Sequence, residues 1–271
     1  MHLPKNRVES NHAMHSGITA ESSTIDRLRE ILSGISKDLN GLPVISVIMP
    51  AFNEEQTVGS IIRRTEEVLQ MLVENYELIV IDDGSTDKTA QRAVQNGATV
   101  ISNGGNLGKG WALSTGLQQA RGHFIVTMDT DGAHRPEEIP RLLYPIVEGN
   151  GVDVVIGSRF RGHIEDNAIP RLNLLGNKIF NLVLSIILGQ RVTDSQSGFR
   201  VYKRTVVEEL IIDSQGFEAE TEMVCKVFRR NFGVKEVPIT CKSRNGTLSK
   251  LNSFNDGFKI LKTILRFSLA Y

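Results

Sequence analysis

Two aspartates separated by a single residue follow an apolar segment in the middle of the chain. The stretch 125–134 reads IVTMDTDGAH, so an apolar run ends at Met128 and is followed at once by Asp129 and Asp131. Residues two apart in an extended chain project to the same side. Two carboxylates on one side suit Mg²⁺, which proteins commonly hold with one or two carboxylates and substrate phosphates. A solvated turn would use the same residue types.

Acidic residues also follow two earlier apolar segments. The stretch 50–55, PAFNEE, follows the first of them, and 82–89, DDGSTDKT, follows the second. If all three acidic segments lie at one edge of a sheet, they repel each other unless cations or donor-rich ligands are present. The three segments together therefore predict that Asp129 and Asp131 hold a metal that binds a diphosphate.

A glycine-rich segment, NGGNLGKGWA at 103–112, contains Lys109. Glycines allow the backbone to approach a ligand closely, and a lysine supplies one charge near a phosphate. The segment is not a P-loop, because Gly110 follows the lysine where a P-loop has Ser or Thr. No GxGxxG follows the first apolar segment, which argues against a dinucleotide-binding dehydrogenase.

Apolar runs alternate with helical patterns from residue 44 onward, and these elements must position the acidic segments. The runs that predict strands are VISVIM, ELIVI, ATVIS, HFIVTM and DVVIG. The stretches between them have helical periodicity, and Asn53 is a possible N-cap for the first helix. Near-continuous apolar strands separated by helices are typical of a parallel sheet with both faces covered. The predicted fold class is therefore α/β, and ligands are expected beyond the carboxyl ends of the strands.

The composition excludes some classes of protein. The chain of 271 residues has 31 Lys and Arg against 31 Asp and Glu, so no global field points to nucleic acid or to an anionic membrane. Its two cysteines, Cys225 and Cys241, form no CxxC pattern and are interpreted as reduced packing residues. No signal peptide is evident and no run approaches 18 apolar residues, so the cytosol is the default compartment.

Taken together, these stretches resemble the family 2 glycosyltransferases with a GT-A fold. The likeness is closest to the dolichyl-phosphate mannose synthase group and its polyprenyl-phosphate sugar-transferase relatives. It implies a GT-A domain at 43–250, a Rossmann-like mostly parallel sheet, between an N-terminal extension at 1–42 with a short helix and a C-terminal amphipathic helix at 251–271. It also implies an inverting enzyme that uses Mg²⁺ or Mn²⁺ to move a hexose, with mannose favoured, from a GDP- or UDP-linked sugar to dolichyl or polyprenyl phosphate.

The resemblance assigns donor-side residues. The residues that would line the base and ribose of the nucleotide sugar are Pro50, Phe52, Glu54, Ile81 and Asp83. The residues that would surround the metal and the diphosphate are Asp129, Thr130, Asp131, Lys109, Arg244 and Lys250. Many relatives carry Gln where this chain has Ala133, so a water or His134 would fill that place near the metal.

A phosphate acceptor needs cations but no strong base, because its second pKa lies near 6 and it is largely dianionic at neutral pH. The candidate acceptor residues are Arg159, Arg171, Ser197, Arg200 and Lys203. By resemblance Arg159, in GSRF, faces the reacting phosphates, so Arg159, Lys109 and Asp131 are the expected catalytic residues. Ser197 and Arg200 lie in TDSQSGFRVYK, which resembles the family's acceptor-side motif; a tight turn into a strand is the alternative.

The stretch FEAETEM contains Glu218, Glu220 and Glu222. In relatives that act on hydroxyl acceptors, an acid near this position serves as the base. The alternative is a helix start, where acidic residues are favoured.

Two stretches suggest a membrane surface. In the first, a polar stripe runs along an otherwise apolar helix and consists of Asn173, Asn177, Asn181 and Ser185. In the second, near the C-terminus, the cations are Lys259, Lys262 and Arg266. Both stretches are expected to be in-plane interfacial helices, which would make the chain peripheral on the cytosolic face of a membrane. Burial against the domain or another subunit is the alternative.

Two other functions stay open. One is a family 2 transferase that uses UDP-glucose or UDP-N-acetylglucosamine, a hydroxyl acceptor, or both. The other is a catalytically silent nucleotide-sugar-binding partner of a membrane complex.

Overall fold

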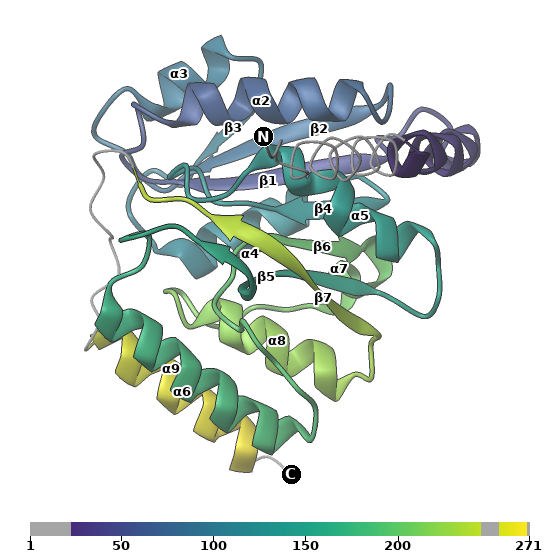
Figure 1. The fold of residues 1–271 in the computed structure, drawn as a ribbon. Helices are drawn as coiled ribbons and strands as arrows, with labels where there is room; N and C mark the ends of the chain where they lie inside the picture. Colours follow the sequence, from purple (N-terminus) through teal and green to yellow (C-terminus); the bar gives the residue numbers. More distant parts are fainter. Residues whose placement is uncertain (1–22, 245–254, 270–271) are drawn as a thin grey trace, which may run out of the picture.

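The computed structural model describes residues 23–244 and 255–269, which form a single sheet with helices on both faces (Figure 1). Lys250 and the first 22 residues lie outside the described residues. The seven strands are β1 (Ile45–Ala51), β2 (Tyr76–Asp82), β3 (Thr99–Ser102), β4 (Phe124–Thr127), β5 (Val154–Ile164), β6 (Arg200–Lys203) and β7 (Val234–Cys241).

The sheet has the strand order β3-β2-β1-β4-β6-β5-β7. All neighbouring strands are parallel except at β6, which is antiparallel to both β4 and β5. The mostly parallel α/β fold predicted from the alternating pattern is therefore confirmed. The antiparallel β6 comes from the segment whose alternative interpretation was a turn into a strand.

Both faces of the sheet are buried, which explains the continuous apolar runs. In β1, Val47 and Met49 pack into one hydrophobic cluster, whereas Ile48, between them, packs into the other. Each face needs its own layer of helices to exclude water from these side chains.

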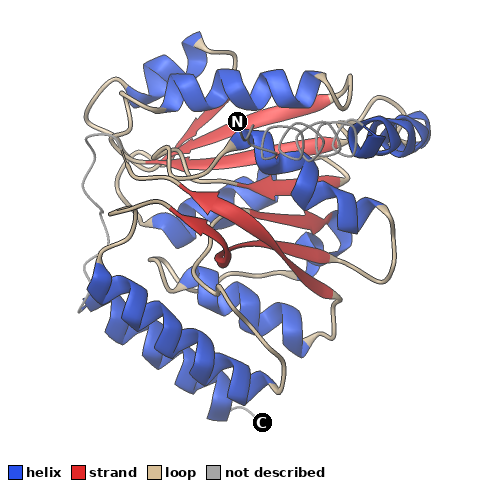
Figure 2. Cartoon of the chain, in the orientation of Figure 1, coloured by secondary structure: helices blue, strands red, loops and turns tan. Residues whose placement is uncertain are grey.

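Helices cover the two faces in two groups (Figure 2). The helices on the first face are helix 23–38, α2 (Val58–Gln70), α3 (Thr89–Gln95), the 3-10 helix η1 (Pro136–Glu138) and α5 (Ile139–Val147). Those on the second face are α4 (Lys109–Gln119), α7 (Arg204–Glu209) and α8 (Ala219–Arg229). The short helix expected before residue 42 is present, and its Leu28 and Leu32 are fully buried in the first cluster.

Two further helices, α6 (Arg171–Leu188) and α9 (Asn255–Leu269), pack against each other beside α8. The polar stripe of α6 faces the protein. Asn181 Nδ2 donates to the Thr193 carbonyl at 2.6 Å, and Ser185 Oγ accepts from the Val192 N–H at 2.9 Å. The opposite side of α6 is exposed and apolar, at Leu172, Leu175, Ile179, Leu182 and Ile186.

Among the described helices, Arg171–Leu188 alone has the length and apolar composition that a membrane crossing requires. Only 11% of this segment is buried in the protein. The sequence contains no unbroken apolar run of that length, because the asparagines and Ser185 interrupt it. These polar residues hold the helix against the body of the protein.

Candidate functional site

The acidic strand ends meet at one edge of the sheet, as predicted. The adjacent strands β2, β1 and β4 are parallel, so their carboxyl ends lie together. The Asp83 N–H donates to the Ala51 carbonyl at 2.9 Å, and Thr130 Oγ1 donates to the Pro50 carbonyl at 3.0 Å. Thr130 is buried and therefore ties the DxD segment to β1 instead of facing a ligand.

The loops after β1 and β2 are joined through Asn53. Its Oδ1 accepts from the Thr86 N–H at 2.8 Å, and its own N–H donates to Ser85 Oγ at 2.9 Å. Asn53 has a positive φ of 51°, and α2 begins only at Val58, so the prediction that Asn53 caps this helix is wrong. Pro50 and Phe52 are partly exposed at this edge, whereas Glu54 is buried.

Asp83 holds the glycine-rich segment in place. Its carboxylate accepts from the Leu107 N–H at 2.9 Å and the Gly108 N–H at 2.8 Å, and also from Asn103 Nδ2 at 3.0 Å. Gly108 has φ +99°, and a Cβ there would lie 2.4 Å from the Gln215 carbonyl oxygen, so only glycine fits. This geometry starts α4 at the point from which Lys109 reaches the site.

Lys109 lies between two carboxylates. Its Nζ is 2.6 Å from Asp129 Oδ1 and 2.7 Å from Glu220 Oε1. Burial works against the charge on Lys109 and Asp129, but their attraction outweighs it, so the pKa of Lys109 is raised and that of Asp129 lowered. For Glu220 burial prevails and raises the pKa.

Asp131 is paired with Arg244. The distance from Asp131 Oδ2 to Arg244 Nη2 is 2.6 Å, and Asp131 Oδ1 accepts from the Ala133 N–H at 2.9 Å. His134 is buried; its Nδ1 accepts from the Asp129 N–H at 3.4 Å. In this structure His134 therefore supports the backbone of the motif, and does not take the place near the metal that Ala133 leaves open.

The described residues fit a metal ion that is bound partly by the protein and partly by a ligand. In residues 23–244 and 255–269, no group of three or more His, Cys, Asp or Glu side chains is arranged around a common centre. A Cβ at Gly198 would lie 2.9 Å from Asp129 Oδ2 and 2.9 Å from Glu220 Oε1, so glycine is needed there for these carboxylates to pack against the backbone. Asp129 and Asp131 are both partly exposed, and two such carboxylates suit Mg²⁺ or Mn²⁺, whose other ligands come from water and phosphates.

Arg159 lies near the middle of β5, which is separated from β4 and its carboxylates by β6. Its Nε and Nη2 donate to Asp194 at 2.8 and 2.7 Å, and its backbone N–H donates to the same carboxylate at 2.9 Å. Burial opposes the charge, yet the attraction of Asp194 raises the pKa of Arg159 above its ordinary value. The pairing leaves Nη1 without a hydrogen-bond acceptor among the described residues.

Arg159 is part of the wall of a pocket of about 870 Å³ between the end of β5 and the start of α6. Arg171 and Lys178 contribute further positive charge, and the apolar part of the lining includes Ile164, Ile169 and Leu174. Glu165 and Asp166 also line the pocket. This arrangement suits an anionic group that is attached to an apolar one.

Three other residues predicted to bind the acceptor do not reach this pocket. Ser197 is fully buried, and Arg200 is 2% exposed, with its guanidinium donating to the backbone carbonyls of Ser195, Ser197 and Glu220. These contacts correct the prediction for Arg200, which braces the segment before β6. The prediction for Lys203 is also wrong, because Lys203 pairs with Phe124 at the start of β4 and binds Asp153 at the opposite edge.

The predicted nucleotide contact at Ile81 needs a correction as well. Ile81 is fully buried in the second hydrophobic cluster, because its side chain points toward α4 and not beyond the strand end. Lys250 lies outside the described residues.

Of the three glutamates in FEAETEM, only Glu220 contacts Lys109. Glu222 accepts from the Asp213 and Ser214 N–H groups. Glu218 accepts from the Gly216 N–H.

Sequence reasoning missed Asp194. No periodicity marks it, but a buried arginine requires a carboxylate or several acceptors. That rule would have directed attention to the acidic residue in TDSQSGFRVYK.

Comparison with known proteins identifies glycosyltransferases. The family model "Glycosyl transferase family 2" matches residues 46–211. The low-salt glycan biosynthesis hexosyltransferase Agl6 of Haloferax volcanii is 34% identical over 232 residues, which is 85% of this chain and 55% of that protein. An undecaprenyl-phosphate 4-deoxy-4-formamido-L-arabinose transferase of Pseudomonas fluorescens is 32% identical over 62% of this chain and 49% of its own length.

The chain thus spans about half the length of these two relatives. Among solved structures, glucosyl-3-phosphoglycerate synthase of Mycobacterium tuberculosis has a TM-score of 0.71 and 28% identity, covering 90% of this chain and 84% of that one. That structure contains Mn²⁺, UDP and glucosyl-3-phosphoglycerate, and another of the same protein contains Mg²⁺ and UDP.

Proposed function

Because the chain belongs to glycosyl transferase family 2, we propose that it moves a hexose from a nucleoside-diphosphate sugar to a polyprenyl phosphate, with inversion at the anomeric carbon. The observation that carries this proposal is the 870 Å³ pocket beside Arg159. The cations Arg159, Arg171 and Lys178 suit a phosphate, and the apolar lining suits the first isoprene units.

In the donor half of the site, Asp129 and Asp131 would hold Mg²⁺ or Mn²⁺ together with the diphosphate. When bound, the metal would neutralise negative charge on the leaving diphosphate. Lys109 and Arg244 lie within ion-pair distance of these aspartates and would donate to the same diphosphate oxygens. The solved relative's complexes with UDP and Mn²⁺ or Mg²⁺ support this arrangement.

In the acceptor half, a phosphate oxygen would attack the anomeric carbon without a base, since the dianion carries no proton to remove. Arg159 would bind that phosphate through Nη1 and lower its repulsion from the donor. Glu220 then serves to hold Lys109, at 2.7 Å, and not as a base.

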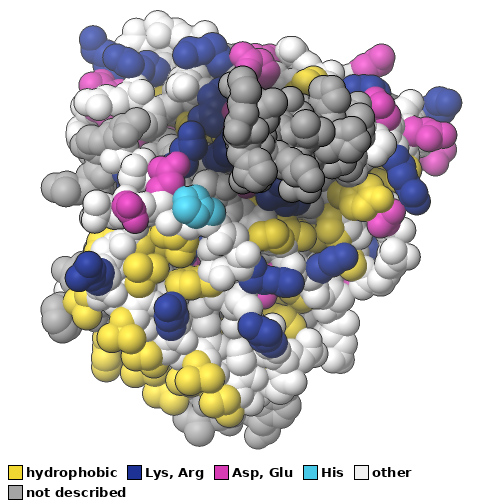
Figure 3. All heavy atoms as spheres, viewed as in Figure 1, with side chains coloured by type: hydrophobic (Ala, Val, Ile, Leu, Met, Phe, Trp, Pro, Cys, Tyr) yellow, Lys and Arg dark blue, Asp and Glu magenta, His cyan; other side chains and the backbone are white. Residues whose placement is uncertain are grey.

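The exposed side of α6 supports a lipid-borne acceptor. Leu172, Leu175, Ile179, Leu182 and Ile186 follow a spacing of three and four, so they form one continuous apolar face. Figure 3 shows hydrophobic side chains gathered over this region, interspersed with Lys and Arg. The pocket lies against the first turns of α6, where this face begins, so a prenyl chain would pass from the lipid surface directly to Arg159. We propose that α6 and α9 bind the cytosolic surface of a membrane in its plane.

A donor and acceptor panel tests this function. The purified chain is incubated with labelled GDP-mannose, UDP-glucose or UDP-N-acetylglucosamine, with dolichyl or undecaprenyl phosphate, and with Mg²⁺ or EDTA. Mannose is favoured by the sequence resemblance, and UDP-glucose is included because the solved relative has been crystallised with it. Metal-dependent label in the lipid phase is the expected result. Donor binding without transfer to any acceptor would instead favour a silent nucleotide-sugar-binding partner.

A soluble acceptor is the second arm of the panel. The solved relative contains a glucosylated phosphoglycerate, so 3-phosphoglycerate is the natural competitor to the lipid. Label in the aqueous product, with none in the lipid, would overturn the proposed acceptor while leaving the donor chemistry intact.

A further inference from the structure

We infer that Glu236 is a positioning residue that fixes Arg159 in its phosphate-binding orientation, although its hydrogen bonds go to Thr193 and Asp194 and not to Arg159. The inference rests on the proposed function, in which Arg159 binds the acceptor phosphate. It depends on one continuous set of hydrogen bonds that runs from β7 through the segment after α6 to β5.

The first part of this set is the Arg159–Asp194 pair. Asp194 is fully buried, and its carboxylate accepts from the Nε, Nη2 and backbone N–H of Arg159. A guanidinium bound through two parallel N–H groups cannot rotate without losing both bonds. The position of the Asp194 carboxylate therefore decides where Nη1 of Arg159 points.

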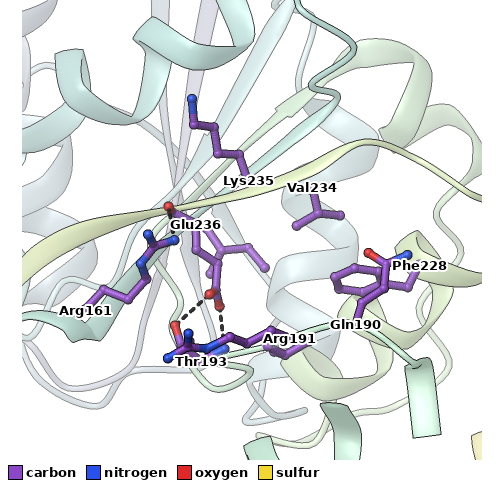
Figure 4. A pocket seen from close by; sticks show the side chains of 10 residues that line it. Arg161, Gln190, Arg191, Thr193, Phe228, Val234, Lys235 and Glu236 are labelled. Carbon is purple, nitrogen blue, oxygen red and sulfur yellow. Dashed lines mark hydrogen bonds between the residues drawn. The ribbon is translucent and has the colours of Figure 1, made fainter. Parts of the chain in front are cut away.

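The second part fixes Asp194 itself. Glu236 Oε1 accepts from the backbone N–H of Thr193 at 2.8 Å and of Asp194 at 3.1 Å, while Glu236 Oε2 accepts from Thr193 Oγ1 at 2.6 Å. Figure 4 shows the Glu236 carboxylate directed at Thr193 within a pocket of about 460 Å³. Asp194 thus receives its backbone position from a carboxylate on the neighbouring strand.

A neutral side chain would hold this segment less firmly than the carboxylate does. Two of the three groups that face Glu236 are backbone N–H groups, which only donate, and the third is the Thr193 hydroxyl, which also lies 2.7 Å from Ser158 Oγ. A carboxylate accepts with two oxygens and its hydrogen bonds are charge-assisted, whereas glutamine offers one oxygen and no charge. The nearby Arg161 binds the backbone of Glu236 instead of its side chain, since its Nη1 donates to the Glu236 carbonyl at 2.8 Å. The side-chain carboxylate of Glu236 therefore binds the segment 193–194.

The same segment is held from its other side by α6. Asn181 donates to the Thr193 carbonyl and accepts from the Ser195 N–H at 2.9 Å. Because Asn181 would keep the segment in place overall, loss of Glu236 should loosen Asp194 locally without unfolding the domain.

The test is Glu236→Gln, with Glu77→Gln as the matched control. Glu77 also accepts from a backbone N–H, that of Arg121 at 2.6 Å, and from a hydroxyl, that of Ser46 at 2.5 Å, but it lies at the opposite edge of the sheet. Glu236→Gln is expected to raise the KM for the lipid phosphate about tenfold, below the ~100-fold that a 1 Å misplacement can cost. The donor KM should stay within about twofold, and Glu77→Gln should leave both KM values unchanged.

A double-mutant cycle separates positioning from general loosening. In an Arg159→Ala background, Glu236→Gln should change the acceptor kcat/KM by less than about twofold, since there is no guanidinium left to orient. An equal fold-change in both backgrounds, or an effect equal to that of Glu77→Gln, would overturn the inference.

Hydrogen exchange at the Arg159 amide gives a readout that needs no acceptor. This N–H donates to Asp194, so Glu236→Gln should speed its exchange whereas Glu77→Gln should not. If the wild type labels only 3-phosphoglycerate, the lipid proposal fails and the cycle is run with that acceptor. If the wild type labels lipid but exchange at Arg159 is unchanged, the inference alone fails.

Discussion

The two halves of the site carry opposite charges and hold them in different ways. On the donor side, the carboxylates of Asp129 and Asp131, which are 23% and 13% exposed, are paired with Lys109 and Arg244. On the acceptor side, the guanidinium of Arg159 is paired with Asp194, which has no exposure at all.

The donor-side ion pairs can therefore be exchanged for contacts with a ligand, whereas the Arg159–Asp194 pair is fixed. Because the carboxylates of Asp129 and Asp131 reach solvent, an incoming metal and diphosphate can take over their pairing with Lys109 and Arg244. Asp194 cannot leave Arg159 without burying an unpaired charge. The donor half is therefore arranged to reorganise when the nucleotide sugar binds, and the acceptor half is arranged in advance.

The largest expected effect comes from removing the exchangeable carboxylates. Asp129→Asn combined with Asp131→Asn should lower kcat/KM by at least about 1,000-fold, because the diphosphate would lose its metal and the alignment of Lys109 and Arg244. Steady-state kinetics with saturating acceptor measure this. Asp26→Asn, at an exposed residue of helix 23–38, is the control, and transfer at the wild-type rate in the double variant would refute the donor assignment.

The fixed Arg159–Asp194 pair should contribute more to the free energy of unfolding than the donor-side pairs do. Asp194→Asn should lower the free energy of unfolding by about 3–5 kcal/mol, since it removes the fully buried charged partner of the largely buried Arg159. Asp131→Asn should cost about 1 kcal/mol or less, because Arg244 can reach water. Urea unfolding of both variants gives the comparison. Equal losses would mean that the two halves do not differ as described.

The apolar face of α6 should control attachment to lipid and not chemistry. Leu182→Glu with Ile186→Glu should weaken binding to anionic vesicles about tenfold or more, since each large apolar side chain gains ~1.5–3 kcal/mol on full burial. Vesicle co-sedimentation measures binding, and a short-chain soluble prenyl phosphate measures turnover. Val94→Glu with Met71→Glu is the control, because these exposed residues belong to α3 and the end of α2, on the other face of the sheet. Unchanged co-sedimentation of the α6 variant with vesicles would contradict the proposal that this face binds a membrane.

The smallest effect is expected at Lys203. Lys203→Met should change the acceptor KM by less than about twofold and stability by less than about 1 kcal/mol, since its ion pair with Asp153 is partly exposed and lies at the far edge. The acceptor KM of an Arg171→Met variant, which alters the pocket itself, is measured in parallel for comparison. A larger KM increase for Lys203→Met than for Arg171→Met would return Lys203 to the acceptor site.

The sequence predicted the donor half of the site better than the acceptor half. Strand periodicity, together with the rule that ligands bind beyond the carboxyl ends of parallel strands, was sufficient to place Asp83, Asp129 and Asp131 at one edge. The acceptor half depends on an antiparallel strand, β6, and on which side of it each residue faces. A four-residue strand has too little periodicity to show that Arg200 is buried and that Lys203 lies at the opposite edge.

The polar stripe of α6 illustrates a second limit. Periodicity identified Asn181 and Ser185 as members of one face, but it could not show which way that face points. In a soluble protein the polar side would normally face water. Here it binds the segment 192–195, which leaves the apolar side exposed, and only the tertiary contacts show this reversal.

The identity of the nucleophile is the most direct test of the account. Purified chain, labelled donor and divalent metal are supplied with undecaprenyl phosphate, with undecaprenol, which lacks the phosphate, or with 3-phosphoglycerate, and each product is identified by mass spectrometry. The account predicts one hexosyl group on the lipid phosphate, none on the alcohol, and much less product, though still a measurable amount, in Arg159→Ala. Transfer to the alcohol, abolished by Glu220→Gln but not by Arg159→Ala, would contradict it.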